Sequence, residues 1–288
     1  MKGFEMKDYM GKNILNILED KYAKKTYQYC REVMHAEFGD NVDYEIMDRQ
    51  ILLCDATREH LYKNPDPVKY VCGTRPLLDK VVDDTIADCK TDREKVLAIF
   101  CYCRDLYKSE GGFGGYDLFM GGTEEDLIKK HEWFCERVSR LMVSLCEIAG
   151  FPGRLIFHIA AGHMTCEIFF EGKWGYLDPR CGLFYLWEDE SFMSVDEIIK
   201  NRDMIYKQNE YVKSFHNPYW DFEYRQHRNY HFCLSPNEIN CFTYYSLTDA
   251  DTYHFNWVNH SYTDPNRYPS LWKEDNRLAE FALMTLIR

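Results

Sequence analysis

Apolar residues recur at helical spacing in the middle of the chain and then give way to short strand-like runs. After Cys135 the apolar positions follow one face of a helix, which predicts an amphipathic helix that Gly150 and Pro152 end. The apolar positions are Val138, Leu141, Met142, Leu145 and Ile148. Strand-like runs follow at 155–159, 164–170 and 173–177, separated by Ala-Gly and Glu-Gly turns. The pattern therefore predicts an α+β fold, with a helix packed on an antiparallel sheet.

The rest of the chain divides into a helical front and an aromatic-rich end. Helical stripes cover the first 60 or so residues, although 51–54 could also be a short buried strand. Helices are also expected over 77–87 and 92–108, the second capped by Thr91, and again after Ser194. A short helix or strand is expected over 278–287.

Aromatic residues interleave with β-formers after position 206, which predicts strands and loops that extend the central sheet or form a small β unit. We expect three regions: a helical N-terminal region over 1–68, a core over 69–205, and a β extension over 206–288.

Composition narrows the class of partner. The chain has 288 residues and a formal net charge of −12, which argues against nucleic acid or an anionic membrane, because both need a basic face. No run is long enough to span a membrane, and the first 25 residues lack the apolar stretch of a signal peptide. We therefore expect a cytoplasmic protein with no nucleic-acid or membrane partner.

The 12 cysteines are expected to be reduced thiols. They are scattered through apolar stretches of a long chain without an export signal, which favours buried thiols over a disulfide framework. The close pair Cys101 and Cys103 lacks the two-residue spacer of redox or zinc motifs. A disulfide framework in a secreted protein is the alternative.

Three residues of the central stretch suggest nucleophilic catalysis. Cys135 opens the predicted helix, where the backbone dipole favours a thiolate, and its polar neighbours indicate an exposed, activated thiol. His163 begins one predicted strand and Asp178 ends the next, so both can meet that thiol. A Cys-His-Asp site uses the imidazole to move the proton and the carboxylate to fix the imidazole.

The same stretch resembles the transglutaminase-like superfamily, whose core has the papain-like fold. The family pattern appears as Cys135 opening a helix, GFPGR at 150–154, HMTCEI at 163–168 and GKWGYLDP at 172–179. The resemblance covers about residues 70–200 and implies the triad Cys135, His163 and Asp178. Two departures stand out: Thr165 replaces an aromatic residue, and Glu132-Trp133-Phe134 replaces the residues that supply an oxyanion donor.

Several other residues invite a second interpretation. His158 competes with His163 for the role of base, but His163 leads the family motif. Arg154 could pair with an acidic residue to brace the strands or lie solvated on the surface.

The glycine-rich loop at 109–122 lacks the Lys-Ser/Thr of a phosphate-binding loop and is expected to border a cleft. A metal site is not favoured by the spacing of the histidines of the C-terminal region. They are His227, His231, His254 and His260.

The sequence thus favours a thiol-dependent enzyme that acts on a peptide, protein or glycopeptide amide. Cysteine peptidase or amidase is the first hypothesis, because no second site for an amine acceptor is visible. Protein-glutamine transamidase and a non-catalytic peptide- or glycan-binding module remain alternatives. We expect no cofactor and no metal, and the oligomeric state stays open.

Overall fold

The described part of the chain is built around one antiparallel sheet. The computed structural model describes residues 51–53, 55–106, 123–131, 134–158, 161–238 and 240–248. Within them, six strands lie in the order β1-β6-β2-β3-β4-β5, and every neighbouring pair is antiparallel. The strands are β1 Ile51–Leu52, β2 Gly153–His158, β3 His163–Phe170, β4 Lys173–Asp178, β5 Leu183–Phe184 and β6 Asn240–Tyr244. The predicted α+β class is confirmed.

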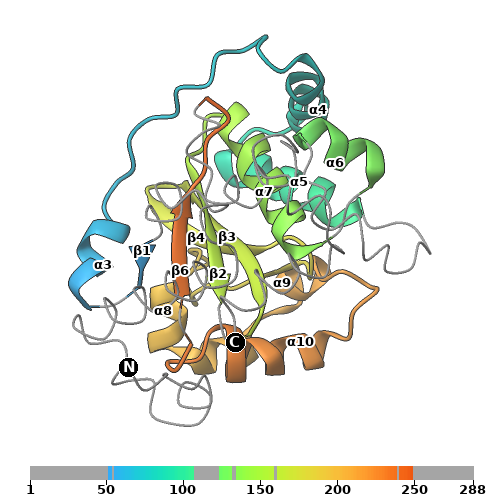
Figure 1. The fold of residues 1–288 in the computed structure, drawn as a ribbon. Helices are drawn as coiled ribbons and strands as arrows, with labels where there is room; N and C mark the ends of the chain where they lie inside the picture. The colour runs from blue at the N-terminus through green and yellow to red at the C-terminus, as the bar shows by residue number, and fades with distance from the viewer. Residues whose placement is uncertain are drawn as a thin grey trace, which may run out of the picture.

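Four helices cover one face of the sheet (Figure 1). They are α4 Pro76–Ile86, α5 Asp92–Asp105, α6 Glu124–Lys130 and α7 Cys135–Ile148. The predicted cap of α5 is present as a capping box, in which Thr91 and Glu94 satisfy each other's backbone N–H groups. The helix α7 is terminated by Gly150, two residues after its last residue Ile148, and the φ of 91° at Gly150 suits a residue without a side chain.

The helix α7 approaches the sheet closely because Gly153 has no side chain. A Cβ atom at this position would lie 2.9 Å from Val143 Cγ1. The Ser139 hydroxyl donates to the Met164 carbonyl oxygen at 3.2 Å, which links α7 to the start of β3. These contacts fix the first turn of α7 near the end of the sheet where β3 begins.

The segment after position 206 differs from the prediction. Residues 206–238 contain helices and no strand, so the expected β structure is wrong for this stretch. The helices from 195 onward are α8 Val195–Lys200, η5 Arg202–Lys207, α9 Glu210–Ser214, α10 Phe222–Arg228 and the π-helix η6 Asn229–Cys233. Asn209 and Asp221 cap α9 and α10 through their side chains, and such local caps favour helix over the β propensity of the aromatic residues. The strand β6 does extend the central sheet, as expected.

At the front of the described chain, the strand alternative for 51–54 is the one that forms. The strand β1 pairs with β6, and α3 Asp55–Leu61 follows it. The segments predicted at 1–50 and 278–287 lie outside the described residues, as does the loop at 109–122. The three expected regions with boundaries at 68 and 205 remain a prediction.

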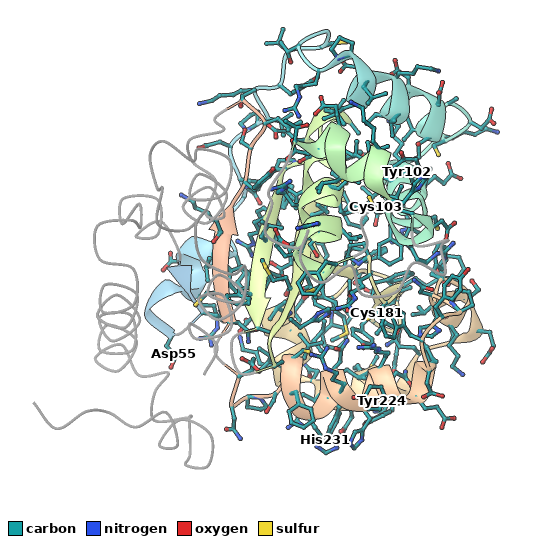
Figure 2. All side chains as sticks on the ribbon, turned by 45° about the vertical axis from the view of Figure 1, so that its right-hand side comes forward. Asp55, Tyr102, Cys103, Cys181, Tyr224 and His231 are labelled. Atoms are coloured by element: carbon teal, nitrogen blue, oxygen red, sulfur yellow. The ribbon has the colours of Figure 1, made fainter. Side chains whose placement is uncertain are left out.

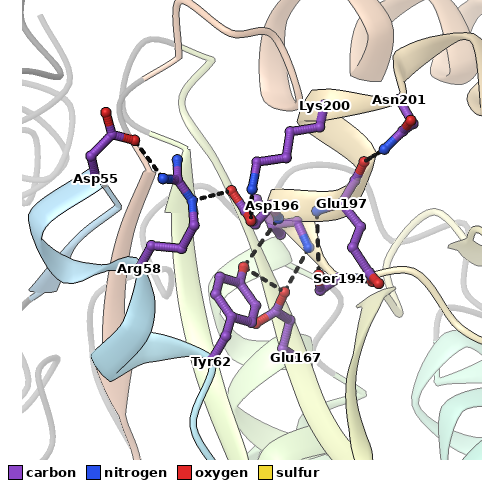
Figure 3. Close-up of polar contacts among 10 residues, drawn as sticks. Asp55, Arg58, Tyr62, Glu167, Ser194, Asp196, Glu197, Lys200 and Asn201 are labelled. Atoms are coloured by element: carbon purple, nitrogen blue, oxygen red, sulfur yellow. Dashed lines mark hydrogen bonds and ion pairs between the residues drawn. The ribbon is translucent and has the colours of Figure 1, made fainter.

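A buried ion pair joins these parts on the second face of the sheet. Arg154 of β2 donates through Nε to Glu167 Oε2 of β3 at 2.9 Å, and both side chains are fully buried. The other carboxylate oxygen of Glu167 accepts from the Val195 backbone at 2.7 Å and from the Tyr62 hydroxyl at 3.2 Å. Figure 3 shows Tyr62 and Glu167 meeting the start of α8 beside Arg58 and Asp196. Arg154 therefore braces the strands from the interior.

Two predictions about the class of protein can be compared with the structure. Within the described residues, no helix is both long and apolar enough to cross a lipid bilayer. The ten cysteines in this part of the chain are all free thiols, in agreement with the reduced state expected from the sequence. Cys30 and Cys54 lie outside the described residues.

Candidate active site

Cys135 is the first residue of α7, as predicted. Phe134 caps the helix with extended backbone and no side-chain hydrogen bond, so no side-chain cap occupies the N–H groups of the first turn. The thiol therefore sits at the positive end of the helix. The exposure expected from the sequence is wrong, because Cys135 is only 4% exposed. A substrate carbonyl can reach the sulfur only if atoms that cover it move.

His163 and Asp178 meet because β3 and β4 are antiparallel. His163 is the first residue of β3 and Asp178 is the last of β4, so both lie at the same end of the sheet. His163 Nε2 lies 2.7 Å from Asp178 Oδ2, and both side chains are buried. A short charge-assisted contact of this kind orients the imidazole and fixes its tautomer.

The carboxylate of Asp178 is held at both of its oxygens. Oδ1 accepts the Cys181 backbone N–H at 3.1 Å while Oδ2 binds His163. The charge of His163 and these hydrogen bonds outweigh the effect of burial, which alone would raise the pKa of Asp178. The pKa of Asp178 is therefore well below its ordinary value. Asp178 therefore does not serve only as the residue before Pro179 in a turn, because its carboxylate binds the His163 imidazole.

The thiol and the imidazole are coupled. Burial would raise the pKa of Cys135, but the hydrogen bond to His163, the charge of His163 and the charge of Arg180 reverse this, and the pKa is lowered to about 7. Burial would lower the pKa of His163, but Asp178 and the thiol of Cys135 raise it well above its ordinary value. His163 Nδ1 has no hydrogen-bond partner among the described residues. Because Nε2 faces Asp178, Nδ1 is the ring nitrogen that remains for the thiol.

The other buried thiols differ from Cys135. Burial raises the pKa of Cys146, which lies on the same helix, and raises the pKa of Cys233 to about 11. The pKa values of Cys103 and Cys166 are raised for the same reason. Among these buried cysteines only Cys135 has a lowered pKa, which agrees with an ionised sulfur near neutral pH.

Two residues of the site were not found from the sequence. Cys181 is buried, and ligand atoms of His163, Asp178 and Cys181 all lie within 4.8 Å of one another. Figure 2 shows Cys181 within the body of the molecule, whereas Tyr224 and His231 lie along the lower helices. Arg180 contributes positive charge near Cys135. Both residues directly follow the Asp-Pro pair, but the motif ends at Pro179 and gave no reason to continue.

His158, the rival of His163, has different partners. Its Nδ1 lies 2.6 Å from Asn240 Oδ1 and its Nε2 lies 2.8 Å from Thr165 Oγ1. It contacts neither Asp178 nor Cys135 by a hydrogen bond in the described residues. Thr165, which departs from the family pattern, therefore supplies a hydroxyl to a second imidazole. The other departure cannot be placed, because Glu132 and Trp133 lie outside the described residues.

One group of side chains in the described residues has the composition of a metal site. His163, Asp178 and Cys181 could each offer one ligand atom, but the carboxylate already binds the imidazole and a backbone N–H group. His227 and His231 lie with their ring centroids 4.2 Å apart and their planes tilted by 47°, and they do not join a cluster of three such residues in the described chain. His254 and His260 lie outside the described residues.

The fold and the buried cluster define an α+β protein in which a helix-terminal cysteine meets a histidine–aspartate pair of the adjoining sheet. Residues 79–179 match the family model of the transglutaminase-like superfamily, so this segment of the chain is similar to that superfamily. The resemblance inferred from the motifs is thereby confirmed. No curated protein and no solved structure matches the chain.

Proposed function

We propose that the chain is a cysteine-dependent amide hydrolase, a peptidase or amidase, with Cys135, His163 and Asp178 as its catalytic residues. The carrying observation is the coupled, buried arrangement in which the thiol has a pKa of about 7 and the imidazole binds a carboxylate at 2.7 Å. Such a pair favours thiolate and imidazolium at neutral pH. The match of residues 79–179 to the transglutaminase-like family model supports the same chemistry.

The first half of the reaction forms a thioester. The Cys135 thiolate adds to the amide carbonyl carbon, and the carbonyl electrons move to oxygen. The backbone N–H of Cys135, at the first position of α7, donates to that oxyanion. The His163 imidazolium gives its proton to the amide nitrogen, the carbon–nitrogen bond breaks, and the amine leaves.

The second half regenerates the thiol. His163, now neutral, takes a proton from water as the water oxygen adds to the thioester carbonyl. The carbon–sulfur bond then breaks, the acid leaves, and sulfur and imidazole return to the ion pair. A primary amine in place of water would give transamidation by the same steps. Hydrolysis is proposed first because it needs only water as the acceptor, whereas transamidation also needs a bound amine.

Alkylation of the thiols tests the proposed nucleophile. A thiol with a pKa of about 7 has about a 30-fold larger thiolate fraction near pH 6 than an ordinary cysteine. A small haloacetamide is needed because Cys135 is 4% exposed. With mass spectrometry at each cysteine, Cys135 should be modified fastest near pH 6, and His163→Ala should remove this preference.

Turnover of amides separates the alternatives. A library of peptide amides, assayed with and without a primary amine, should be hydrolysed, and amine incorporation would instead indicate a transamidase. Cys135→Ala should abolish turnover, whereas Cys146→Ala, a matched change on the same helix, should retain it. Alkylation of Cys135 no faster than that of the other thiols, together with no turnover, would favour the non-catalytic binding module.

A further inference from the structure

A second imidazole lies beside His163 in the interior, with its plane nearly parallel to that of His163. His158 of β2 and His163 of β3 are directly opposed residues in the sheet register. Their ring centroids are 6.2 Å apart and their planes differ by 21°. His158 is fully buried and His163 is 1% exposed. In this arrangement the position of the His158 ring restricts the orientation of the His163 ring.

Hydrogen bonds from two neighbouring strands hold the His158 ring in place. Asn240 of β6 lies on one side of it and Thr165 of β3 on the other, at 2.6 and 2.8 Å from the two ring nitrogens. With Asn240 Oδ1 as acceptor, Nδ1 carries the proton, and Nε2 accepts the proton of the Thr165 hydroxyl. Both nitrogens are thereby used, so the orientation of the ring plane is fixed.

Burial and the neighbouring charge keep this ring neutral. Desolvation first, and then the charge of His163, lower the pKa of His158 to about 3, while the hydrogen bond to Asn240 and the charge of Asp178 act weakly in the opposite direction. Arg228 lowers it further, and the Tyr176 ring packs against it edge-on at 6.3 Å. A neutral ring does not compete with His163 for a proton, and its π-face tolerates an adjacent imidazolium.

The carboxylate of Asp178 alone leaves His163 a degree of freedom. The hydrogen bond at Nε2 fixes one point on the ring, and the thiols of Cys135 and Cys181 are weak partners that restrain its tilt about that point only loosely. Tilting would move Nδ1 away from Cys135 while the contact to Asp178 survived. A fixed flat neighbour at stacking distance opposes this tilt.

We propose that His158, held by Thr165 and Asn240, is a positioning residue that sets the plane of the His163 imidazole and so keeps Nδ1 directed at Cys135. This inference rests on the proposed function. His158 acts through His163 and does not itself exchange a proton with substrate. It also gives Thr165 a role, since its hydroxyl fixes the ring that flanks His163.

Substitution of the ring separates its face from its nitrogens. His158→Phe keeps a flat face and His158→Ala removes it. If the face positions His163, the Ala variant should lose at least about tenfold in the rate of Cys135 alkylation near pH 6, the order of loss expected from a small misplacement. The midpoint of its pH profile should also rise. The Phe variant keeps the flat face but loses the hydrogen bonds to Thr165 and Asn240, so its alkylation rate should lie between those of the Ala variant and the wild type.

A milder pair of changes protects the test against variants that do not fold. Thr165→Val keeps the shape and removes the hydroxyl, whereas Thr165→Ser keeps the hydroxyl. Thr165→Val should slow Cys135 alkylation and raise its pH midpoint, and Thr165→Ser should change neither. Nitrogen-15 NMR of the wild-type histidines should show His158 protonated at Nδ1 only near neutral pH.

The outcomes are distinct. Wild-type alkylation kinetics in both His158→Ala and Thr165→Val would overturn the positioning role. An equal loss in His158→Phe and His158→Ala would assign the effect to the imidazole nitrogens and also overturn it. If wild-type Cys135 is not the fastest thiol, the proposed function fails first. The NMR result would then still report whether His158 is the fixed, neutral ring described above.

Discussion

Three ionisable side chains of the site depend on one another for their charges. The Asp178 carboxylate raises the pKa of His163, and His163 in turn lowers the pKa of Cys135 to about 7 although the sulfur is buried. His158 lies one strand away and has the opposite behaviour, because burial and the charge of His163 lower its pKa to about 3. Two histidines five residues apart thus differ in charge because only one of them has a carboxylate as its hydrogen-bond partner.

The neutral state of His158 makes the fold sensitive to acid. Its folded pKa of about 3 lies below the unfolded value of about 6.5. Between these values the unfolded chain binds a proton that the folded chain does not, so stability falls as pH falls. The slope for this residue is about 1.4 kcal/mol per pH unit.

Comparison of the wild type with His158→Phe isolates that slope. Urea unfolding at several pH values should show the stability advantage of the wild type shrinking by about 2 kcal/mol between about pH 6.5 and pH 5. The Asp and Glu side chains titrate in both proteins, so most of their contribution to the pH dependence cancels in the difference. A difference that stays constant over this interval would show that His158 is protonated in the fold as readily as in the unfolded chain.

At the scale of elements, local signals predicted much of the core. The start of α7 at Cys135, its end at Gly150 and the order of β2, β3 and β4 follow from periodicity and turn residues. The cap at Thr91 also appears as expected. These features depend on residues close in sequence, which is why a single chain suffices to predict them.

Long-range pairing and surface helices were not predictable in the same way. The strand β6 lies between β1 and β2, a register that no local pattern specifies, and Asn240 reaches His158 only because of it. The helix α10 was missed because its aromatic residues suggested a strand. Tyr224 on that helix is 58% exposed, so its ring does not report a buried strand face. The burial of Cys135 likewise depends on packing from several elements.

The turn that directly follows Asp178 at the end of β4 depends on Gly182. The Gly182 N–H donates to the Asp178 carbonyl at 2.9 Å, and the Asn217 N–H donates to the Cys181 carbonyl at 3.0 Å. The φ of Gly182 is 68°, and a Cβ there would overlap the Phe215 carbonyl oxygen and crowd the Asn217 nitrogen. Both the conformation and the space therefore require glycine.

Gly182→Ala should destabilise the protein more than a matched change in another turn. Gly172 has a similar φ of 76°, but a Cβ there meets nothing within 4 Å. Gly172→Ala should cost about 1 kcal/mol for its backbone alone, whereas Gly182→Ala should cost at least about 3 kcal/mol because the backbone must also shift. Urea denaturation of both variants measures the difference. Equal losses would mean that the turn can move away from Phe215 freely.

At the scale of the whole molecule, the sheet separates two apolar cores. One core contains the helices α4 to α7, and the other gathers residues from α3, α8, η5 and η6. Arg154 and Glu167 lie on the side of the second core, where the guanidinium also stacks over the Trp174 ring at 4.0 Å. The carboxylate of Glu167 additionally holds Tyr62 and Val195. This ion pair therefore links segments more than one hundred residues apart.

Loss of the negative charge in that core should affect the whole described fold. Glu167→Gln keeps the shape but removes the carboxylate charge that faces the fully buried Arg154 guanidinium, which should cost about 3 to 5 kcal/mol. The matched change is Glu171→Gln, which breaks the 2.7 Å pair with Arg93 at the surface, where the side chains are 36% and 25% exposed. That pair should contribute less than about 1 kcal/mol. Urea unfolding followed by circular dichroism measures both losses, and hydrogen exchange should show increased opening in β2, β3 and α8 together for Glu167→Gln. If the two variants lose the same stability, the buried pair does not join these segments, and packing of the two cores alone holds them.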